Sequence, residues 1–575
     1  MKVEMSFHNR YYPWTEVSTG DVSCRLKGTF FYENELLQND DIVRLFSSVF
    51  EGSRIDHEVL RAHLLALNGS FALALETPRH IFCAVDRVRS IPLFYAVSGN
   101  EALFSDDANH LRDCLNPPFN EENGAEFLVT GYVTGSDTLF DGISQLRTGE
   151  YLIYDREDET LNTYFYHRFW HGDYFSDSEE ELLDRLDEVF VRVFERLIAS
   201  AKGRQIVVPL SGGLDSRIIV AMLKRLGVED VICFTYGKRG NREAEISRQV
   251  AEALGYQWYF VEYTKEKLYD CYHSDEMQHY RKYGGDLVSL PHTQDFLAVK
   301  ELKEEGKIHE IAIFVPGHSG DMLAGSWIPK DYDKSQVYTF EKFLGESLKK
   351  HYNLWKWDGA EFWLLFKSRI QRSMGDIVVH DNDSCANAVE FFNFNERQAK
   401  YIVNSVRVYE FFGFQWQIPL WDVELIDIFL KMPILQRIDQ RIYKNYARKK
   451  LFISNFKALS LIECTTKISE EPDKVRSAII KSRVKSIFRI LPSYSDSGWE
   501  RYYRYPTITR MFNLFGWGYD NPFLEGGHLH EIIRYNQKPL HIMRLGGYRS
   551  KKNLSLIKTA KDNKDANLKT HQGLK

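Results

Sequence analysis

The stretch VVPLSGGLDSRIIVAML, residues 207–223, places two glycines and an acid between a β-branched run and a helical pattern. Residues 206–210 are typical of a buried strand, and residues 214–226 carry apolar side chains at helical spacing. Residues 211–213 must therefore turn sharply and present backbone N–H groups at a helix N-terminus. Unpaired N–H groups and the helix dipole both favour negative charge, so the turn predicts a site for a phosphate group.

Strands and helices alternate along the chain from residue 206. Strand patterns follow at 231–236, 258–263 and 311–315, with a helical pattern at 243–254. This alternation predicts a parallel sheet, whose ligands bind beyond the carboxyl ends of the strands. Residues 1 to about 160 are instead rich in strand-like segments separated by turn residues, and a charged amphipathic helix is expected from Asp177.

Bulk properties exclude several classes of protein. The net charge of -6 argues against general nucleic-acid binding. No apolar run is long enough to span a bilayer, and the first residues show no signal peptide, so no membrane association is expected. The seven cysteines form no CxxC pair or zinc pattern, which favours reduced thiols and a cytoplasmic location.

The first glycine-rich turn lacks the lysine of a Walker A loop. The hydroxyls of Ser211 and Ser216 are suited to phosphate oxygens. Asp215 is unusual in an anion site unless it holds a cation, and Mg²⁺ bound by a carboxylate and substrate phosphates is the usual arrangement. The alternative is that Asp215 only caps the helix.

The motif SGGLDS at residues 211–216 resembles the pyrophosphate loop of the ATP-pyrophosphatase superfamily. That resemblance implies adenylation, in which ATP is cleaved to AMP and pyrophosphate. Arg217 replaces the usual Ser or Thr, and a cation there opposes the helix dipole, so we expect either a nearby anion or a side chain that points to solvent. The residues expected to bind ATP or pyrophosphate are Leu210, Ser211, Gly212, Gly213, Leu214, Asp215, Ser216, Arg217, Thr235 and Gly317.

A second stretch, PGHSGDMLAGS at residues 316–326, resembles the SGEGADELFGG pattern of asparagine synthetases. The resemblance places Asp321 on the family's acidic residue, so Asp215 and Asp321 would share Mg²⁺. His318 stands where asparagine synthetases have Glu and β-lactam synthetases have Tyr. It is expected to accept a proton from the attacking amine, since the pKa of histidine lies near the working pH. A histidine with a purely structural hydrogen bond is the alternative.

A third stretch, QWQIPLWDVELIDIFLKMP, resembles the family pattern ExRxPFLDxxLVxFxxxLP. Gln415 and Gln417 replace the Glu and Arg of a polar wall near the active centre in that family. The loss of these two charges implies that the carboxylate substrate is not aspartate bound in the usual way. Downstream, YKNYARKK resembles the family's KxxLR and places Lys444 and Arg448. Lys444 is expected to neutralise pyrophosphate or the transition state, with a solvated helix lysine as the alternative.

The stretches DHEVLRAHLLALNGSFALALE and AVDRVRSIPLFYA resemble the glutaminase domain of the same synthetases. That domain needs a Cys directly after the initiator Met, where this chain has Lys2. Its NGE motif corresponds to residues 27–29, which read Lys-Gly-Thr. A start at Met5 with Ser6 as nucleophile is a weaker alternative. We expect this domain to be a structural partner that hydrolyses no glutamine.

The resemblance implies an α/β fold with an α+β N-terminal half. An Ntn-hydrolase-like β-sandwich is followed by a doubly wound parallel-sheet ATP-pyrophosphatase domain of the adenine nucleotide α-hydrolase type. The expected units are a degenerate glutamine-amidotransferase-like domain at 1–165 and the ATP-pyrophosphatase domain at 175–465. A helical, aromatic extension is expected at 466–550 and a basic, disordered tail at 551–575.

The leading functional hypothesis is an AMP-forming amide ligase that uses ATP and Mg²⁺ to join a small-molecule or peptide carboxylate to an amine. His318 and Lys444 are the candidate catalytic residues. An asparagine synthetase that uses free ammonia is the first alternative, and a non-catalytic nucleotide-binding scaffold is the second. A tRNA-thiolating enzyme is disfavoured because the chain has neither a catalytic cysteine pair nor a strongly basic domain. Whether the chain forms a homodimer is left open by the sequence.

Overall fold

The computed structural model describes residues 2–8, 11–50, 55–330, 332, 339–354, 357 and 359–462. The extension predicted at 466–550 and the tail predicted at 551–575 lie outside these ranges. Among the described residues, no helix is both long and apolar enough to cross a membrane.

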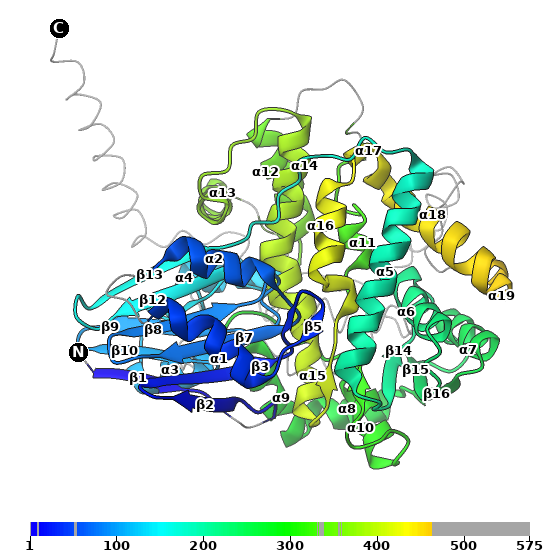
Figure 1. Ribbon diagram of the computed structural model, residues 1–575, viewed down its shortest axis with the longest axis horizontal. Helices are drawn as coiled ribbons and strands as arrows, with labels where there is room; N and C mark the ends of the chain where they lie inside the picture. Colours follow the sequence, from blue (N-terminus) through cyan, green and yellow to red (C-terminus); the bar gives the residue numbers. More distant parts are fainter. Residues whose placement is uncertain are drawn as a thin grey trace, which may run out of the picture.

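Two main sheets form the N-terminal half (Figure 1). The larger has six strands in the order β13 (Thr160–Phe165), β12 (Glu150–Asp155), β8 (His80–Val85), β7 (Phe71–Glu76), β3 (Val22–Gly28) and β2 (Thr15–Thr19). The other has four, in the order β1 (Lys2–Ser6), β10 (Glu101–Ser105), β9 (Phe94–Ser98) and β11 (Ser144–Gln145). A small third sheet joins β5 (Glu35–Leu36), β4 (Phe31–Tyr32) and β6 (Leu67–Asn68).

Strand β7 explains why the two main sheets stack. Its side chains alternate between two cores, as strand geometry requires. Ala72 and Ala74 belong to the core that includes Phe104 of β10, so this face packs on the four-stranded sheet. Leu73 and Leu75 belong to the core that is closed by α1 (Asn39–Ser47) and α2 (His57–Ala66). Helix α3 (Ala108–Leu115) packs on the four-stranded sheet, which gives the predicted α+β sandwich.

The second half is built on a parallel sheet of five strands. Their order is β16 (Gln257–Glu262), β15 (Val231–Gly237), β14 (Ile206–Pro209), β17 (Ile313–Phe314) and β18 (Gln415–Trp416). The doubly wound fold predicted from residues 206–315 is therefore confirmed. The strand expected at 311–315 is shorter than predicted, and β18 was not anticipated. The strand order reverses between β14 and β17, and such a switch point is where ligands bind in open α/β sheets.

Helices cover both faces of this sheet. Helices α6 (Leu214–Arg225) and α7 (Arg242–Leu254) pack together on β14, β15 and β16. Helices α10 (Phe296–Glu304) and α15 (Arg407–Phe411) pack together on β16 and β18. The predicted amphipathic helix is α5 (Glu179–Ala201), which begins with Ser178 and Glu181 in a capping box.

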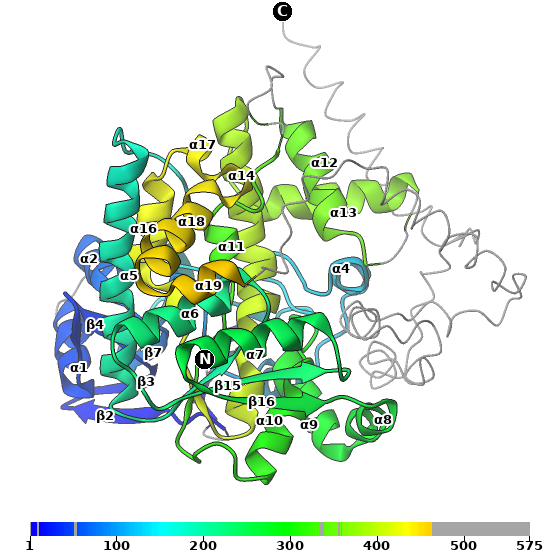
Figure 2. The ribbon, with the colours of Figure 1, turned by 90° about the vertical axis from the view of Figure 1, so that its right-hand side faces the viewer.

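Figure 2 shows α12, α13 and α14 gathered above the parallel sheet. The remaining helices lie in both halves of the chain. They are η1 (Ser48–Phe50), α4 (Glu121–Thr130), α8 (Lys265–His273), α9 (Asp275–Gly285), α11 (Gly320–Leu323), α12 (Phe340–His351), α13 (Ala360–Met374), α14 (Asn382–Asn393), η2 (Phe394–Ile402), η3 (Val403–Val406), η4 (Pro419–Trp421), α16 (Val423–Lys431), α17 (Ile434–Arg437), η5 (Ile438–Gln440), α18 (Arg441–Asn445), η6 (Tyr446–Ile453) and α19 (Lys457–Leu461).

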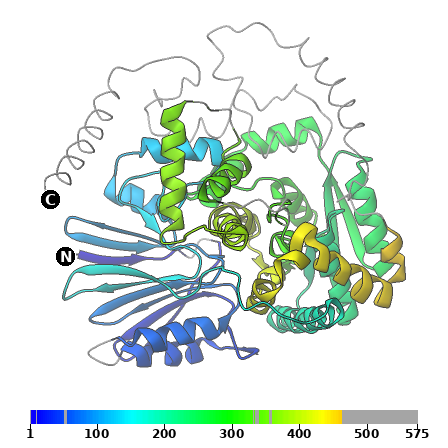
Figure 3. The same ribbon diagram turned by 90° about the horizontal axis from the view of Figure 1, so that it is seen from above.

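The two halves lie side by side, with the N-terminal sheets on the left of Figure 3 and the parallel sheet on the right. Polar contacts join them. The Asn68 side-chain amide donates to Asp422 at 3.1 Å, and Arg87 forms an ion pair of 2.7 Å with Asp427. Asp422 also receives two hydrogen bonds from Arg196 of α5, at 2.7 and 2.9 Å. Asp422, which lies in the third sequence stretch, therefore connects the two halves.

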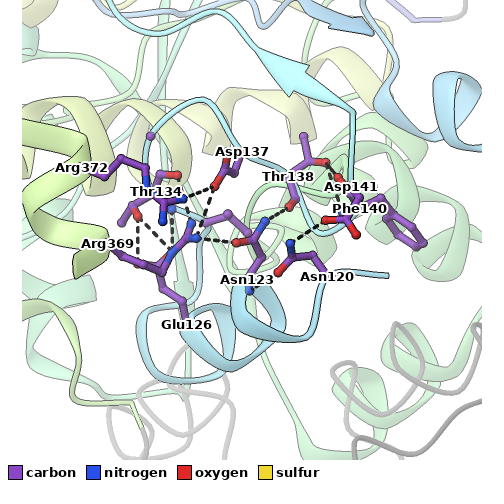
Figure 4. Close-up of polar contacts among 12 residues, drawn as sticks. Asn120, Asn123, Glu126, Thr134, Asp137, Thr138, Phe140, Asp141, Arg369 and Arg372 are labelled. Atoms are coloured by element: carbon purple, nitrogen blue, oxygen red, sulfur yellow. Dashed lines mark hydrogen bonds and ion pairs between the residues drawn. The ribbon is translucent and has the colours of Figure 1, made fainter. Parts of the chain in front are cut away.

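A buried polar network ties α4 to α13 (Figure 4). Arg369 Nε donates to Glu126 Oε2 at 2.7 Å, and Arg369 Nη1 donates to Asn123 Oδ1 at 2.5 Å. Glu126 also accepts from the Thr134 backbone N–H at 2.9 Å and from the Tyr352 hydroxyl at 2.7 Å. Because every charge has a partner, this network can be buried without a ligand.

Candidate functional site

The two glycine-rich turns meet at the carboxyl ends of β14 and β17. Asp215, in the first turn of α6, accepts a hydrogen bond from the Asp321 backbone N–H at 3.1 Å. The other oxygen of Asp215 accepts from the Tyr443 hydroxyl at 2.9 Å. The structure therefore brings together the two acids that the sequence singled out. It adds Tyr443, which sequence reasoning missed.

Two glycines permit this close approach. A Cβ atom added at Gly317 would lie 2.7 Å from the Ser216 amide nitrogen. A Cβ atom added at Gly320 would lie 2.5 Å from Tyr443 Oη and 2.9 Å from Asp215 Oδ1. Side chains cannot occupy such positions, so the second loop needs glycine where it packs against the first loop.

The first loop keeps an open helix N-terminus. Helix α6 has no side-chain cap, whereas Asn241 caps the neighbouring helix α7. The Ser211 and Ser216 hydroxyls lie 3.1 Å apart, and Ser211 Oγ accepts from the Gly213 N–H at 3.1 Å. The unpaired N–H groups of the first turn, the helix dipole and the two serine hydroxyls therefore all favour an anion at the N-terminus of α6.

The acid pair carries an electrostatic imbalance. Burial, reinforced by the charge of Asp321, raises the pKa of Asp215 to about 7. Asp321 is exposed, and in the described part of the chain no basic side chain forms an ion pair with either carboxylate. The described residues contain no group of three or more acidic, histidine or cysteine side chains that could hold a metal. Two carboxylates nevertheless suit Mg²⁺, which takes its other ligands from water and phosphate.

His318 is held by Ser405. The Ser405 hydroxyl donates to the Ile402 carbonyl at 2.6 Å, so its oxygen is left to accept from His318 Nε2 at 3.0 Å. This assignment leaves the lone pair of the imidazole on Nδ1. Burial lowers the pKa of His318 to about 4, with a further contribution from His292. The expectation of a pKa near the working pH was therefore wrong for this structure, and the ring is neutral at pH 7.

Three predicted nucleotide-binding residues are engaged within the protein. Arg217 is buried, and its guanidinium donates to the Ile462 carbonyl at 3.0 Å, so the solvent-pointing alternative was wrong. The Thr235 hydroxyl bonds to the Leu210 carbonyl and lies 2.5 Å from Ser247 Oγ. Leu210 donates its own N–H to Phe234. These groups shape the base of the loop, and Leu214 packs against the core below it.

Lys444 lies beside the site without touching the acid pair. Its Nζ donates to the Asp439 carbonyl at 2.6 Å, and it is the preceding residue, Tyr443, that reaches Asp215. The short helix α18 begins after two residues with positive φ, Asp439 and Gln440. Arg448 is exposed. The only sequence signal for Tyr443 was its place next to the lysine of the resembling motif.

The two glutamines of the third stretch bond to residues other than the acid pair. Gln417 Nε2 donates to Thr29 Oγ1 at 2.8 Å, which joins the two halves of the chain. Gln415 Oε1 accepts from Arg204 at 2.7 Å. Neither glutamine bonds to Asp215 or Asp321, and the prediction that the acid substrate is not aspartate bound in the usual way stays a prediction. Thr29 belongs to the Lys-Gly-Thr segment, whose Lys27 forms an ion pair with Asp106 at 3.4 Å.

Comparisons with known proteins agree with this architecture. The sequence model of the family described as "Asparagine synthase" matches residues 193–451, and that of "Glutamine amidotransferase domain" matches residues 56–166. A probable glutamine-hydrolysing asparagine synthetase of Acanthamoeba polyphaga mimivirus is 27% identical over 170 residues. That alignment covers 28% of this chain and 30% of the relative, so the match spans about a third of the curated relative.

Among solved structures, the glutamine phosphoribosylpyrophosphate amidotransferase of B. subtilis is similar at 14% identity and a TM-score of 0.19. The match covers 42% of this chain and 72% of that one. The NH3-dependent NAD synthetase of Campylobacter jejuni matches at 12% identity and a TM-score of 0.19, over 31% of this chain and 75% of that one.

Proposed function

Because this chain belongs to the asparagine synthetase family, we propose that it is a C–N ligase that uses ATP to form an amide. In the first step, a carboxylate oxygen attacks the α-phosphorus of ATP and the bond to pyrophosphate breaks. In the second step, an amine attacks the acyl carbon, the bond to AMP breaks, and the amine nitrogen loses a proton. The products are the amide, AMP and pyrophosphate.

The acid pair at the switch point is the observation that carries this proposal. Asp215 and Asp321 are held together with no cation from the described residues, so a bound cation would relieve their repulsion. We propose that they hold Mg²⁺, which would neutralise the charge that develops on pyrophosphate. Tyr443 positions the Asp215 carboxylate through its hydroxyl.

The loop between β14 and α6 is the proposed seat of pyrophosphate. The uncapped first turn of α6 offers backbone N–H groups, and Ser211 and Ser216 offer hydroxyls. Arg217 contributes from below by fixing the loop through its bonds to backbone carbonyls. Lys444 has a long, flexible side chain and directly follows Tyr443 in the chain. We propose that Lys444 reaches pyrophosphate when ATP is bound.

His318 is the proposed acceptor of the amine proton. A neutral imidazole with a free lone pair can take this proton once the C–N bond forms, because bond formation makes the amine nitrogen strongly acidic. Ser405 sets the orientation of the ring. The lowered pKa makes His318 a weak base, so it would act on the intermediate after amine attack.

We propose that the N-terminal half is a structural partner without glutaminase activity. Lys27 and Thr29 stand at two positions of the glutamine-holding motif that it resembles, and both are engaged in other contacts. The amine would then arrive as free ammonia, as a second substrate or as part of the first. We propose small-molecule or peptide substrates and a cytoplasmic location, as the sequence indicates. The sequence leaves open whether the chain forms a homodimer.

Transfer of label from acid to nucleotide tests the proposal. A panel of ¹⁸O-labelled carboxylic acids is incubated with ATP, Mg²⁺ and amines, and we expect AMP that carries one ¹⁸O atom with one of the acids. Asp215→Asn should abolish this product. Asp230→Asn, at the opposite end of the sheet where Asp230 accepts from Gln205, should not affect it. Formation of ADP, or of AMP without label, contradicts the adenylation step.

A further inference from the structure

A cavity of about 290 Å³ lies between the two halves of the chain, away from the acid pair. Tyr12, Lys27 and Asp106 line it from the N-terminal half, and Asp286, Asn404 and Arg407 line it from the second half. Neither Asp215 nor Asp321 contributes to its wall. Its volume is near the lower end of the range for small-molecule sites in proteins.

The acids of this cavity differ in how they are neutralised. Asp106 receives Lys27 Nζ at 3.4 Å and the Trp14 indole N–H at 2.7 Å. Asp286 instead uses one carboxylate oxygen to accept from the Ala108 N–H at 2.9 Å and the Asn109 side-chain amide at 3.2 Å. In the described ranges it forms no ion pair. Burial and the charge of Asp107 raise the pKa of Asp286 well above its usual value.

The opposite side of the wall offers aromatic rings. Arg407 is 4% exposed, and its two terminal nitrogens bond to Glu410 and to the Ser90 carbonyl. Its Nε is enclosed by the protein and does not reach the cavity. The ring of Tyr283 also lines the cavity. Aromatic faces attract organic cations and cover aliphatic chains, so they favour the same kind of ligand as an acid without a counter-ion.

We propose that this cavity binds a small molecule that carries a primary ammonium group. The ammonium group pairs with Asp286 on the cavity wall. The ligand thereby supplies an ion pair, which Asp286 forms with no described residue.

The cavity is linked to the candidate active centre through one short segment. Asn404 lines the cavity, and the next residue, Ser405, holds His318. An occupant is therefore placed to act either as the amine substrate or as an effector that shifts Ser405. Both sources share the ammonium chemistry, and binding to the cavity does not depend on the proposed ligase function.

The test uses 4-aminobutan-1-ol and its uncharged counterpart butane-1,4-diol, with affinities measured by calorimetry on the full chain without ATP. We expect the amino alcohol to bind the wild type at least tenfold more tightly than the diol. Asp286→Asn should remove this preference. It keeps the acceptor oxygen, and asparagine tolerates the φ of +41° at this position, so the variant should fold. Asp113→Asn, an acid on the same face with 58% of its side chain exposed, should retain the preference.

Equal binding of the two probes by the wild type, or an unchanged preference in Asp286→Asn, overturns the proposal. A ¹⁵N-labelled probe then separates the two sources. Label in the amide product identifies the occupant as the amine substrate, and a changed rate of ATP–pyrophosphate exchange without label in the product identifies an effector. Because binding is read without nucleotide, failure of the ligase proposal leaves this result standing.

Discussion

Glu126 is fully buried and Asp215 is half-buried, and these two acids in different parts of the molecule have charged neighbours of opposite sign. Glu126 on α4 is fully buried, is paired with Arg369 and accepts from Thr134 (Figure 4). The Tyr352 hydroxyl also donates to it. Asp215 has comparable hydrogen bonds, from Tyr443 and from the Asp321 backbone. Its charged neighbour, however, is a second acid.

In the proposed function, this difference separates an acid that belongs to the fold from one that binds a ligand. Removal of one partner of a buried ion pair costs several kcal/mol. Glu126 already has its partner in Arg369, so the network needs no ligand. Two neighbouring carboxylates repel, and the raised pKa of Asp215 expresses that repulsion together with burial. A bound cation would relieve this repulsion, as the proposed function requires.

The largest effect is expected from breaking the complete network. Glu126→Gln removes the closer of the two carboxylates that pair with the buried Arg369 and leaves only Asp137 at 3.3 Å, so we expect the free energy of unfolding to fall by about 3 kcal/mol. Urea denaturation measures this loss. Arg372→Gln, which removes a 64% exposed side chain 3.7 Å from Asp137, should cost under about 1 kcal/mol. A similar cost for both variants would show that burial does not distinguish them.

The second-largest effect is expected from a side chain added between the two glycine-rich loops. Gly320→Ala forces a methyl group against Tyr443 Oη and Asp215, so we expect a loss of about 1–3 kcal/mol in unfolding free energy and at least tenfold slower amide formation. The control is Gly345→Ala in α12, where no atom lies within 4 Å of the added carbon. That change should stabilise the chain by about 0.5–1 kcal/mol. Full activity in Gly320→Ala would refute the close-packed loop arrangement.

Local patterns in the sequence predicted the elements that carry the site. Helix α6 and strand β14 follow from residues adjacent in the chain. The resemblance to the SGEGADELFGG pattern paired Asp215 with Asp321, and the carboxyl-end rule for parallel strands places both turns at one edge of the sheet. The sequence did not predict strand β18, because this strand has two residues, Gln415 and Trp416, and pairs only with β17. Sequence spacing could not predict two of the contacts, because their partners lie far apart in the chain. Arg369 and Glu126 are 243 residues apart, and Tyr443 and Asp215 are 228 residues apart.

The pH dependence of stability should show the burial of His318. Between pH 6.5 and about 4 the unfolded chain binds a proton at this residue and the folded chain does not, so stability falls as the pH drops through that window. We expect His318→Gln to lose less stability than the wild type there, by on the order of 1–2 kcal/mol. Denaturant midpoints at pH 7 and pH 5 give the comparison. Parallel losses in both proteins would contradict a lowered pKa.

The smallest effect is expected at the contact between the halves. Gln417→Ala removes the hydrogen bond to Thr29, which should cost about 0.5–1.5 kcal/mol in unfolding free energy. Gln415→Ala, which loses a bond to Arg204 at the surface, should cost less. If the order is reversed, the contact between Gln417 and Thr29 does not stabilise the junction.

ATP–pyrophosphate exchange in Asp321→Asn tests the central claim most directly, that the acid pair serves a ligand and not the fold. With Mg²⁺ and the carboxylic acid that supports exchange in the wild type, the variant should exchange at least 100-fold more slowly. Its free energy of unfolding should be unchanged or higher, because the substitution removes repulsion from Asp215. Undiminished exchange in Asp321→Asn, or a loss of exchange that accompanies unfolding, would contradict the account.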